Sequence, residues 1–167
     1  MSQKADQAKG AYRIPGRNSG SCEWKIVAVR EMPAPEKMLR CDTPEAAASY
    51  WQTHIATAPN FNPEVECFAV LLLNTRHRIR GYQIVSIGSL NETVVHPREV
   101  FRAAVISAAY AIVLMHNHPS GEPEPSSADI KVTRMFVEAG KLLRIEVLDH
   151  VIVGHQRHYS FREAGHL

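Results

Sequence analysis

Two histidines and an aspartate have a spacing that suits a metal site. His116 and His118 are separated by a single residue, and Asp129 follows after a segment that contains three prolines. If the histidines lie on a strand, their imidazoles point to the same side, because side chains alternate between the two faces. Two imidazole nitrogens and one carboxylate oxygen are a ligand set of catalytic zinc, which keeps its fourth position open for water. The pattern therefore predicts a water-activating Zn²⁺ site.

An apolar segment leads directly into these histidines. Residues 110–115 (YAIVLM) have the composition of a buried strand, and the end of such a strand can hold imidazoles rigidly. The alternative is a pair of loop histidines that serve as turn or surface residues. The adjoining strand and the aspartate that follows favour the metal site.

Ser126 and Asp129 support a second, structural interpretation. A Ser followed three residues later by an acid at a helix start is typical of a capping box. Carboxylates are also favoured near a helix N-terminus. The two interpretations are compatible, because a cap that fixes where the helix begins lets its first turn present Asp129 to the metal.

The remaining elements are predicted from apolar periodicity and from cap and breaker residues. Strands are expected at residues 24–30, 67–73, 79–87, 110–115, 144–153 and near 158–161. Helices are expected from 44 to about 57, from 97 to 109, and from 126 to near Gly140. This order predicts an α/β fold in which helices sandwich a mixed β-sheet.

Composition is that of an ordinary soluble domain. The chain has 167 residues, 45% of them apolar, and a net charge of +2, so that electrostatics alone do not predict nucleic-acid binding. Its three cysteines form no C-x-x-C pair, which fits a reducing compartment. No segment has the length of apolar sequence that a membrane span needs. We expect a cytoplasmic protein without a membrane partner.

The N-terminal 21 residues are polar and lack the apolar core of a signal peptide. They predict a disordered tail, residues 1–21, ahead of a single domain over residues 22–167.

A water-activating site also needs a proton carrier. A carboxylate beside the metal can take a proton from water and return it to a leaving amine. The nearby candidates are Glu64, Glu66, Glu92, Glu122 and Glu124. Spacing alone does not choose among them, although Glu66 directly precedes the strand expected at 67–73.

Several segments together resemble a known family. They are residues 66–74 (ECFAVLLLN), 86–90 (SIGSL), 95–101 (VHPREVF), 116–129 (HNHPSGEPEPSSAD) and 148–154 (LDHVIVG). The pattern of a Glu, then H-x-H, seven residues and S-x-x-D resembles the motif of the JAMM (MPN+) metalloproteases, and the wider sequence is similar to their RadC-like branch, which has a JAB domain. The resemblance covers roughly residues 42–165.

The resemblance implies a role for each motif residue. His116, His118 and Asp129 match the zinc ligands, Glu66 matches the general acid/base, and Ser126 matches the serine that stabilises the oxyanion. The implied fold is the MPN/JAB sandwich, which is similar to that of cytidine deaminases. The implied reaction is zinc-dependent hydrolysis of a peptide or isopeptide bond in an unknown protein or peptide substrate.

Other functions stay open at this point. The alternative is a DNA-repair-associated or DNA-binding RadC-like protein without demonstrated peptidase activity. Longer RadC-like proteins carry an N-terminal helix-hairpin-helix region for which this sequence has no room, so support for a nucleic-acid partner is weak. A catalytically silent MPN module is a third class, although such modules usually lack the ligands. An exposed strand edge would permit a homodimer.

Three further features carry weaker expectations. Asp149 and His150 are interpreted as a strand-end pair oriented by local hydrogen bonds, in preference to support for a ligand histidine. Asn117, between the two histidines, is expected to point away from the metal side and to brace the loop. The basic cluster at residues 76–80 is interpreted as a solvated turn in preference to a nucleic-acid contact.

Overall fold

The structure, a computed structural model, describes residues 37–88 and 95–167. The strand expected at 24–30 and the tail expected at 1–21 lie outside these residues, so both stay predictions, as does the domain boundary. Within the described residues, no helix combines the length and the apolar character that crossing a bilayer would require.

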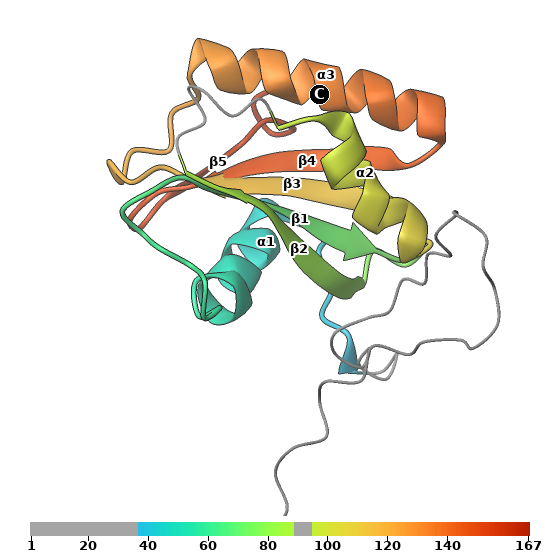
Figure 1. Ribbon diagram of the computed structural model, residues 1–167, viewed down its shortest axis with the longest axis horizontal. Coiled ribbons are helices and arrows are strands. Elements are labelled where there is room, and N and C mark those ends of the chain that lie inside the picture. Colours follow the sequence, from blue (N-terminus) through green and yellow to red (C-terminus); the bar gives the residue numbers. More distant parts are fainter. Residues whose placement is uncertain (1–36, 89–94) are drawn as a thin grey trace, which may run out of the picture.

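A mixed sheet, as the sequence predicted, forms the centre of the fold, with five strands in the described residues (Figure 1). Its strands are β1 (Cys67–Leu73), β2 (Ile79–Ile87), β3 (Ala111–Asn117), β4 (Glu146–Val153) and β5 (His158–Ser160). They are arranged in the order β2-β1-β3-β4-β5, with β3 and β4 parallel and the other neighbours antiparallel. β1 and β3 are buried along their whole length, which is expected of central strands that are covered on both faces.

Helices cover both faces of this sheet. α1 (Pro44–Tyr50) and the π-helical turn η2 (Trp51–Ile55) lie against one face, whereas α2 (Pro97–Ile106) and α3 (Ser127–Leu143) lie against the other (Figure 1). The expected α/β sandwich is therefore confirmed.

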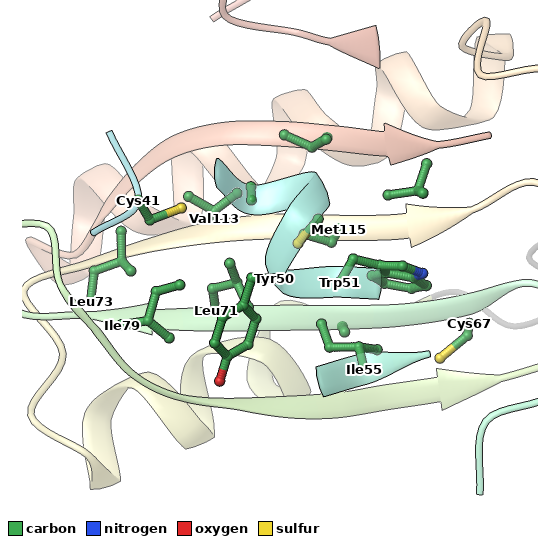
Figure 2. Packing of buried hydrophobic residues seen from close by; sticks show 14 of the residues in the cluster. Cys41, Tyr50, Trp51, Ile55, Cys67, Leu71, Leu73, Ile79, Val113 and Met115 are labelled. Carbon is green, nitrogen blue, oxygen red and sulfur yellow. The ribbon is translucent and has the colours of Figure 1, made fainter. Parts of the chain in front are cut away.

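Each face of the sheet packs its own hydrophobic core. Figure 2 shows the core beneath α1 and η2, where Trp51 packs with Leu71 and Met115. The opposite core includes Leu114 of β3 and Phe136 of α3. Because side chains alternate along a strand, His116 shares the face of Leu114, which is the face that α3 covers.

The ends of all three helices differ from the sequence prediction. The helix expected to run to about residue 57 is α-helical only to Tyr50. It then widens into η2, where the amide of Ala56 donates to the carbonyl of Trp51. The hydroxyl of Thr53 bonds the Ser49 carbonyl at this point and competes for the helical ladder. α2 stops at Ile106, before the expected residue 109.

Gly140 does not end α3, contrary to the sequence prediction. The helix continues to Leu143, and Arg144 makes the left-handed cap at a φ of 57°. Gly140 is instead a site of close approach, because a Cβ there would lie 2.5 Å from the backbone oxygen of Ile145. Its missing side chain lets the helix end pack tightly against the start of β4.

We predict that Gly140→Ala lowers the free energy of unfolding by about 1–3 kcal/mol, the usual cost of overpacking. The added methyl group must displace backbone rather than a flexible side chain. Chemical denaturation measures the effect. Gly81→Ala is the control, because a Cβ at Gly81 meets no atom within 4 Å. Equal stability of the two variants would contradict the close-approach interpretation.

Candidate metal centre

The two histidines lie at the end of β3 with their imidazoles on the same side, as expected. His116 is the penultimate residue of the strand and is fully buried. His118 follows the strand, and its amide donates to the carbonyl of Val153 at 3.1 Å, which extends the pairing with β4. The Nε2 atoms of the two rings are 3.1 Å apart.

Asp129 enters this cluster from the first turn of α3. The Oδ1 atom of Asp129 lies 3.3 Å from His116 Nε2, and its Oδ2 atom lies 3.6 Å from His118 Nε2. The ligand atoms of the three residues all lie within 4.8 Å of one another, so the group could hold a metal ion.

The predicted capping box is present at the start of α3 and orients this carboxylate. The hydroxyl of Ser126 accepts a hydrogen bond from the amide of Asp129 at 3.2 Å. In return, the amide and the hydroxyl of Ser126 donate to Asp129 Oδ2 at 2.7 and 2.6 Å. With two donors on Oδ2, the other oxygen of Asp129 is directed towards His116.

The hydrogen bonding of His118 suits a metal ligand. Its Nδ1 atom lies 2.7 Å from the carbonyl oxygen of Glu122. A carbonyl only accepts, so Nδ1 must carry the hydrogen. In the neutral ring the lone pair is then on Nε2, the atom that faces His116 and Asp129. The hydrogen bond from His118 Nδ1 therefore leaves Nε2 free to bind a cation, and this conclusion does not depend on the motif.

The electrostatics of the cluster also favour a cation. Burial alone would raise the pKa of the Asp129 carboxyl, but its contacts with His116, His118 and Ser126 hold that pKa well below its usual range. The Asp129 carboxylate in turn raises the pKa of His118, against the opposing effect of desolvation. A stable carboxylate beside two imidazoles attracts positive charge.

Glu66 directly precedes β1, the strand that pairs with the histidine-bearing strand β3. β1 pairs antiparallel with β3, with Phe68 opposite His116. Continuing this register by two residues brings Glu66 level with His118, and cross-strand partners project from the same face. The charge of Glu66 also contributes to the raised pKa of His118, which agrees with this position.

Asn117 points away from the ligands, as expected, but it braces a different segment from the one predicted. Its Oδ1 atom accepts from the amide of Cys67 at 2.8 Å, and its Nδ2 donates to the carbonyl of Val65 at 3.1 Å. These two peptide groups flank Glu66. The residue between the two histidines therefore fixes the backbone of the candidate general base.

The other glutamates are less suited to proton transfer. Glu122 forms an ion pair with Arg157 at the surface, and Glu64 and Glu124 are exposed. Glu92 lies outside the described residues.

In the basic cluster at residues 76–80, Arg76 is exposed, and Arg80 donates to the carbonyl of Ala108.

The prediction that kept His150 apart from the site was wrong, and the pair Asp149–His150 lies within β4 rather than at a strand end. Asp149 accepts one local hydrogen bond, as predicted, from the His150 amide, and a second, non-local one from the Ser160 hydroxyl of β5. His150, in contrast, lies 2.8 Å from Nδ1 of His116. Burial holds the pKa of His150 well below its usual range. Thr133, which contacts the other ring nitrogen of His150, carried no signal in the sequence.

Comparison with known proteins places the chain in a family. The family model described as RadC-like JAB domain matches residues 41–166. The chain belongs to this family. The match includes all the residues of the candidate site and confirms the resemblance drawn from the motif.

Curated relatives carry the family name UPF0758 protein. The chain is 55% identical to that of Alkaliphilus metalliredigens over 98 residues, which is 59% of this chain and 42% of the relative. It is 45% identical to that of Bacillus mycoides over 125 residues, 75% of this chain and 53% of the relative. The matched part therefore spans about half the length of these relatives.

We predict that Ser126→Ala lowers the free energy of unfolding by about 0.5–2 kcal/mol in metal-free protein, the usual cost of losing an N-cap. Thr43→Ala is the matched control, because Thr43 caps α1 in the same way, with its side chain accepting from the Ala46 amide. Both variants are compared by denaturation and by zinc titration. Only Ser126→Ala should also weaken zinc binding; unchanged stability would contradict the capping role.

Proposed function

We propose that this domain is a zinc-dependent hydrolase of the JAMM type that cleaves a peptide or isopeptide bond. The observation that carries the proposal is the convergence of the His116 and His118 Nε2 atoms with the Asp129 carboxylate. His116, His118 and Asp129 would hold the metal, Glu66 would move the proton, and Ser126 would stabilise the oxyanion.

The spacing of the three ligands supports zinc. Bonds of about 2.0–2.1 Å in a tetrahedron place neighbouring ligand atoms about 3.3 Å apart. The Nε2 atoms of His116 and His118 are 3.1 Å apart, and Asp129 Oδ1 lies 3.3 Å from His116 Nε2. One ligand atom from each of the three residues lies within 4.8 Å of the others. Three protein ligands leave one position for water or substrate, which is typical of catalytic rather than structural zinc.

Zinc, when bound, polarises a carbonyl and lowers the pKa of a coordinated water. Glu66 would accept a proton from the attacking water as its oxygen bonds to the carbonyl carbon. The same carboxyl would then donate that proton to the nitrogen as the carbon–nitrogen bond breaks. The products are a carboxylate and an amine. The two hydrogen bonds of Asn117 to the backbone on either side of Glu66 support this role, because they limit the positions open to the carboxylate.

Ser126 would donate a hydrogen bond to the oxygen of the scissile carbonyl. Its hydroxyl donates to Asp129 Oδ2 in this structure. Rotation about the Cβ–Oγ bond would direct the same hydrogen to an oxyanion, while the oxygen could still accept from the Asp129 amide. Ser126 is exposed, so a substrate can reach it.

The proposal predicts cleavage that depends on zinc. The purified chain is stripped with a chelator, reloaded with Zn²⁺, and incubated with a mixture of linear peptides and lysine-isopeptide-linked peptides. In ¹⁸O-water, mass spectrometry should detect labelled carboxylates with the reloaded protein and not with the stripped protein. No cleavage by protein that holds about one zinc per chain, or equal cleavage after stripping, would overturn the proposed function.

A further inference from the structure

A chain of three buried hydrogen bonds links the ring of His116 to the backbone of Asp129. His116 Nδ1 lies 2.8 Å from His150 Nε2, and His150 Nδ1 lies 2.6 Å from Thr133 Oγ1. Thr133 Oγ1 lies 2.6 Å from the carbonyl oxygen of Asp129. His116, His150 and Thr133 are all essentially inaccessible to solvent. This series of hydrogen bonds therefore joins two candidate ligands, His116 of β3 and Asp129 of α3, through His150 of β4 and Thr133 of α3.

The direction of each hydrogen bond follows from its last acceptor. The Asp129 carbonyl can only accept, so the Thr133 hydroxyl donates to it. Thr133 Oγ1 must then accept from His150, which places a hydrogen on Nδ1 of His150. If His150 is neutral, its Nε2 is an acceptor, and the hydrogen between the two imidazoles belongs to Nδ1 of His116.

The surroundings of His150 favour the neutral ring. Its centroid lies 4.9 Å from that of Phe161 in a stacked arrangement and 5.6 Å from that of Phe68. An imidazolium ion enclosed by aromatic side chains and without solvent contact would be costly. With His150 neutral, the donor and the acceptor of each of the three hydrogen bonds are defined.

We propose that Thr133 and His150 are positioning residues that hold the hydrogen of His116 on Nδ1 and so direct the Nε2 lone pair of His116 to the metal. The inference rests on the proposed zinc site. Partners of this kind fix both the tautomer and the orientation of a ligand imidazole, and their loss typically lowers metal affinity by about 10–100-fold. His118 obtains the same tautomer more simply, from the backbone carbonyl of Glu122.

Zinc affinity of two Thr133 variants tests this role. Thr133→Val keeps the shape of the side chain but removes the hydroxyl, whereas Thr133→Ser keeps the hydroxyl. In competition with a chromophoric chelator, we expect Thr133→Val to bind Zn²⁺ about 10–100-fold more weakly than wild type and Thr133→Ser to stay within a few-fold of it. Equal affinity of wild type and Thr133→Val, or an equal loss in both variants, would overturn the inference.

A second measurement needs neither zinc nor a variant. Nitrogen-15 NMR of the histidine rings in metal-free wild-type protein reports which ring nitrogen carries hydrogen. We expect a hydrogen on Nδ1 and a bare Nε2 in His150, with Nδ1 of His116 protonated. A hydrogen on Nε2 of His150 would overturn the inference. If zinc binds but no substrate is cleaved, the proposed function fails while affinity and tautomers still decide the role of Thr133 and His150.

Discussion

Glu66→Gln is expected to lower the rate of hydrolysis by about 10²–10⁴-fold, the usual contribution of a positioned general acid/base. Glutamine has nearly the same shape as glutamate but cannot take a proton from water. The hydrogen bonds of Asn117 hold the backbone on both sides of residue 66, so the substitution should leave the local structure in place. The rate is measured on a substrate found with the zinc-loaded wild-type protein.

Glu64→Gln is the matched control for this variant. Glu64 lies two residues earlier and is exposed, so its rate should stay close to that of wild type. Zinc content is measured on both variants and should remain near one per chain. A Glu66→Gln protein that binds zinc and cleaves at the wild-type rate would remove Glu66 from the mechanism.

His118→Ala is expected to weaken zinc binding by more than about 100-fold. This exceeds the usual effect of removing a residue that only hydrogen-bonds a metal ligand. His118 is a better choice than His116 for this test, because its side chain is 13% exposed and that of His116 is fully buried. Loss of His118 should therefore disturb the core less. Competition with a chelator gives the affinity, and hydrolysis should fall with it.

His54→Ala provides the control for the loss of a histidine. His54 is exposed in η2, which packs against the opposite face of the sheet from α3. Zinc affinity should be unchanged in this variant. Zinc bound by His118→Ala as tightly as by wild type would exclude His118 as a ligand.

The candidate ligands were predictable because the information about them is local. His116 and His118 are close in the sequence, and the apolar residues before them predict the strand that sets their direction. The S-x-x-D pattern that includes Asp129 is itself the signal of a helix start. Residue types and spacing were therefore enough to bring these three side chains together.

Glu66 could not be chosen by spacing, because its position depends on the pairing of β1 with β3. The antiparallel register brings it level with His118 across a long stretch of chain. Only the resemblance to the JAMM motif selected it among five glutamates. The partners of Asn117 depend on the same pairing, so the sequence predicted that Asn117 would act as a brace but assigned it to the wrong segment, the loop.

Thr133 had no such local pattern, and the Asp149–His150 pair did not show from the sequence that His150 contacts His116. His150 is buried in β4 and Thr133 in α3. The contact of His150 with His116 follows from the pairing of β4 with β3, and its contact with Thr133 follows from the packing of α3 on the sheet. Gly140 shows the same limitation, since a glycine near a helix end usually indicates a cap. Here the nearby Ile145 backbone, known only from the fold, gives it another role.

The dual position of Ser126 has a consequence for mutational tolerance. A library of all residues at position 126, selected only for folding, should retain Ser, Thr, Asp, Asn and Gly, the residues that favour an N-cap. The same library selected for zinc-dependent hydrolysis should narrow to the hydroxyl residues Ser and Thr. The variants that pass the first selection and fail the second would isolate the chemical contribution of one oxygen atom from its contribution to the start of α3.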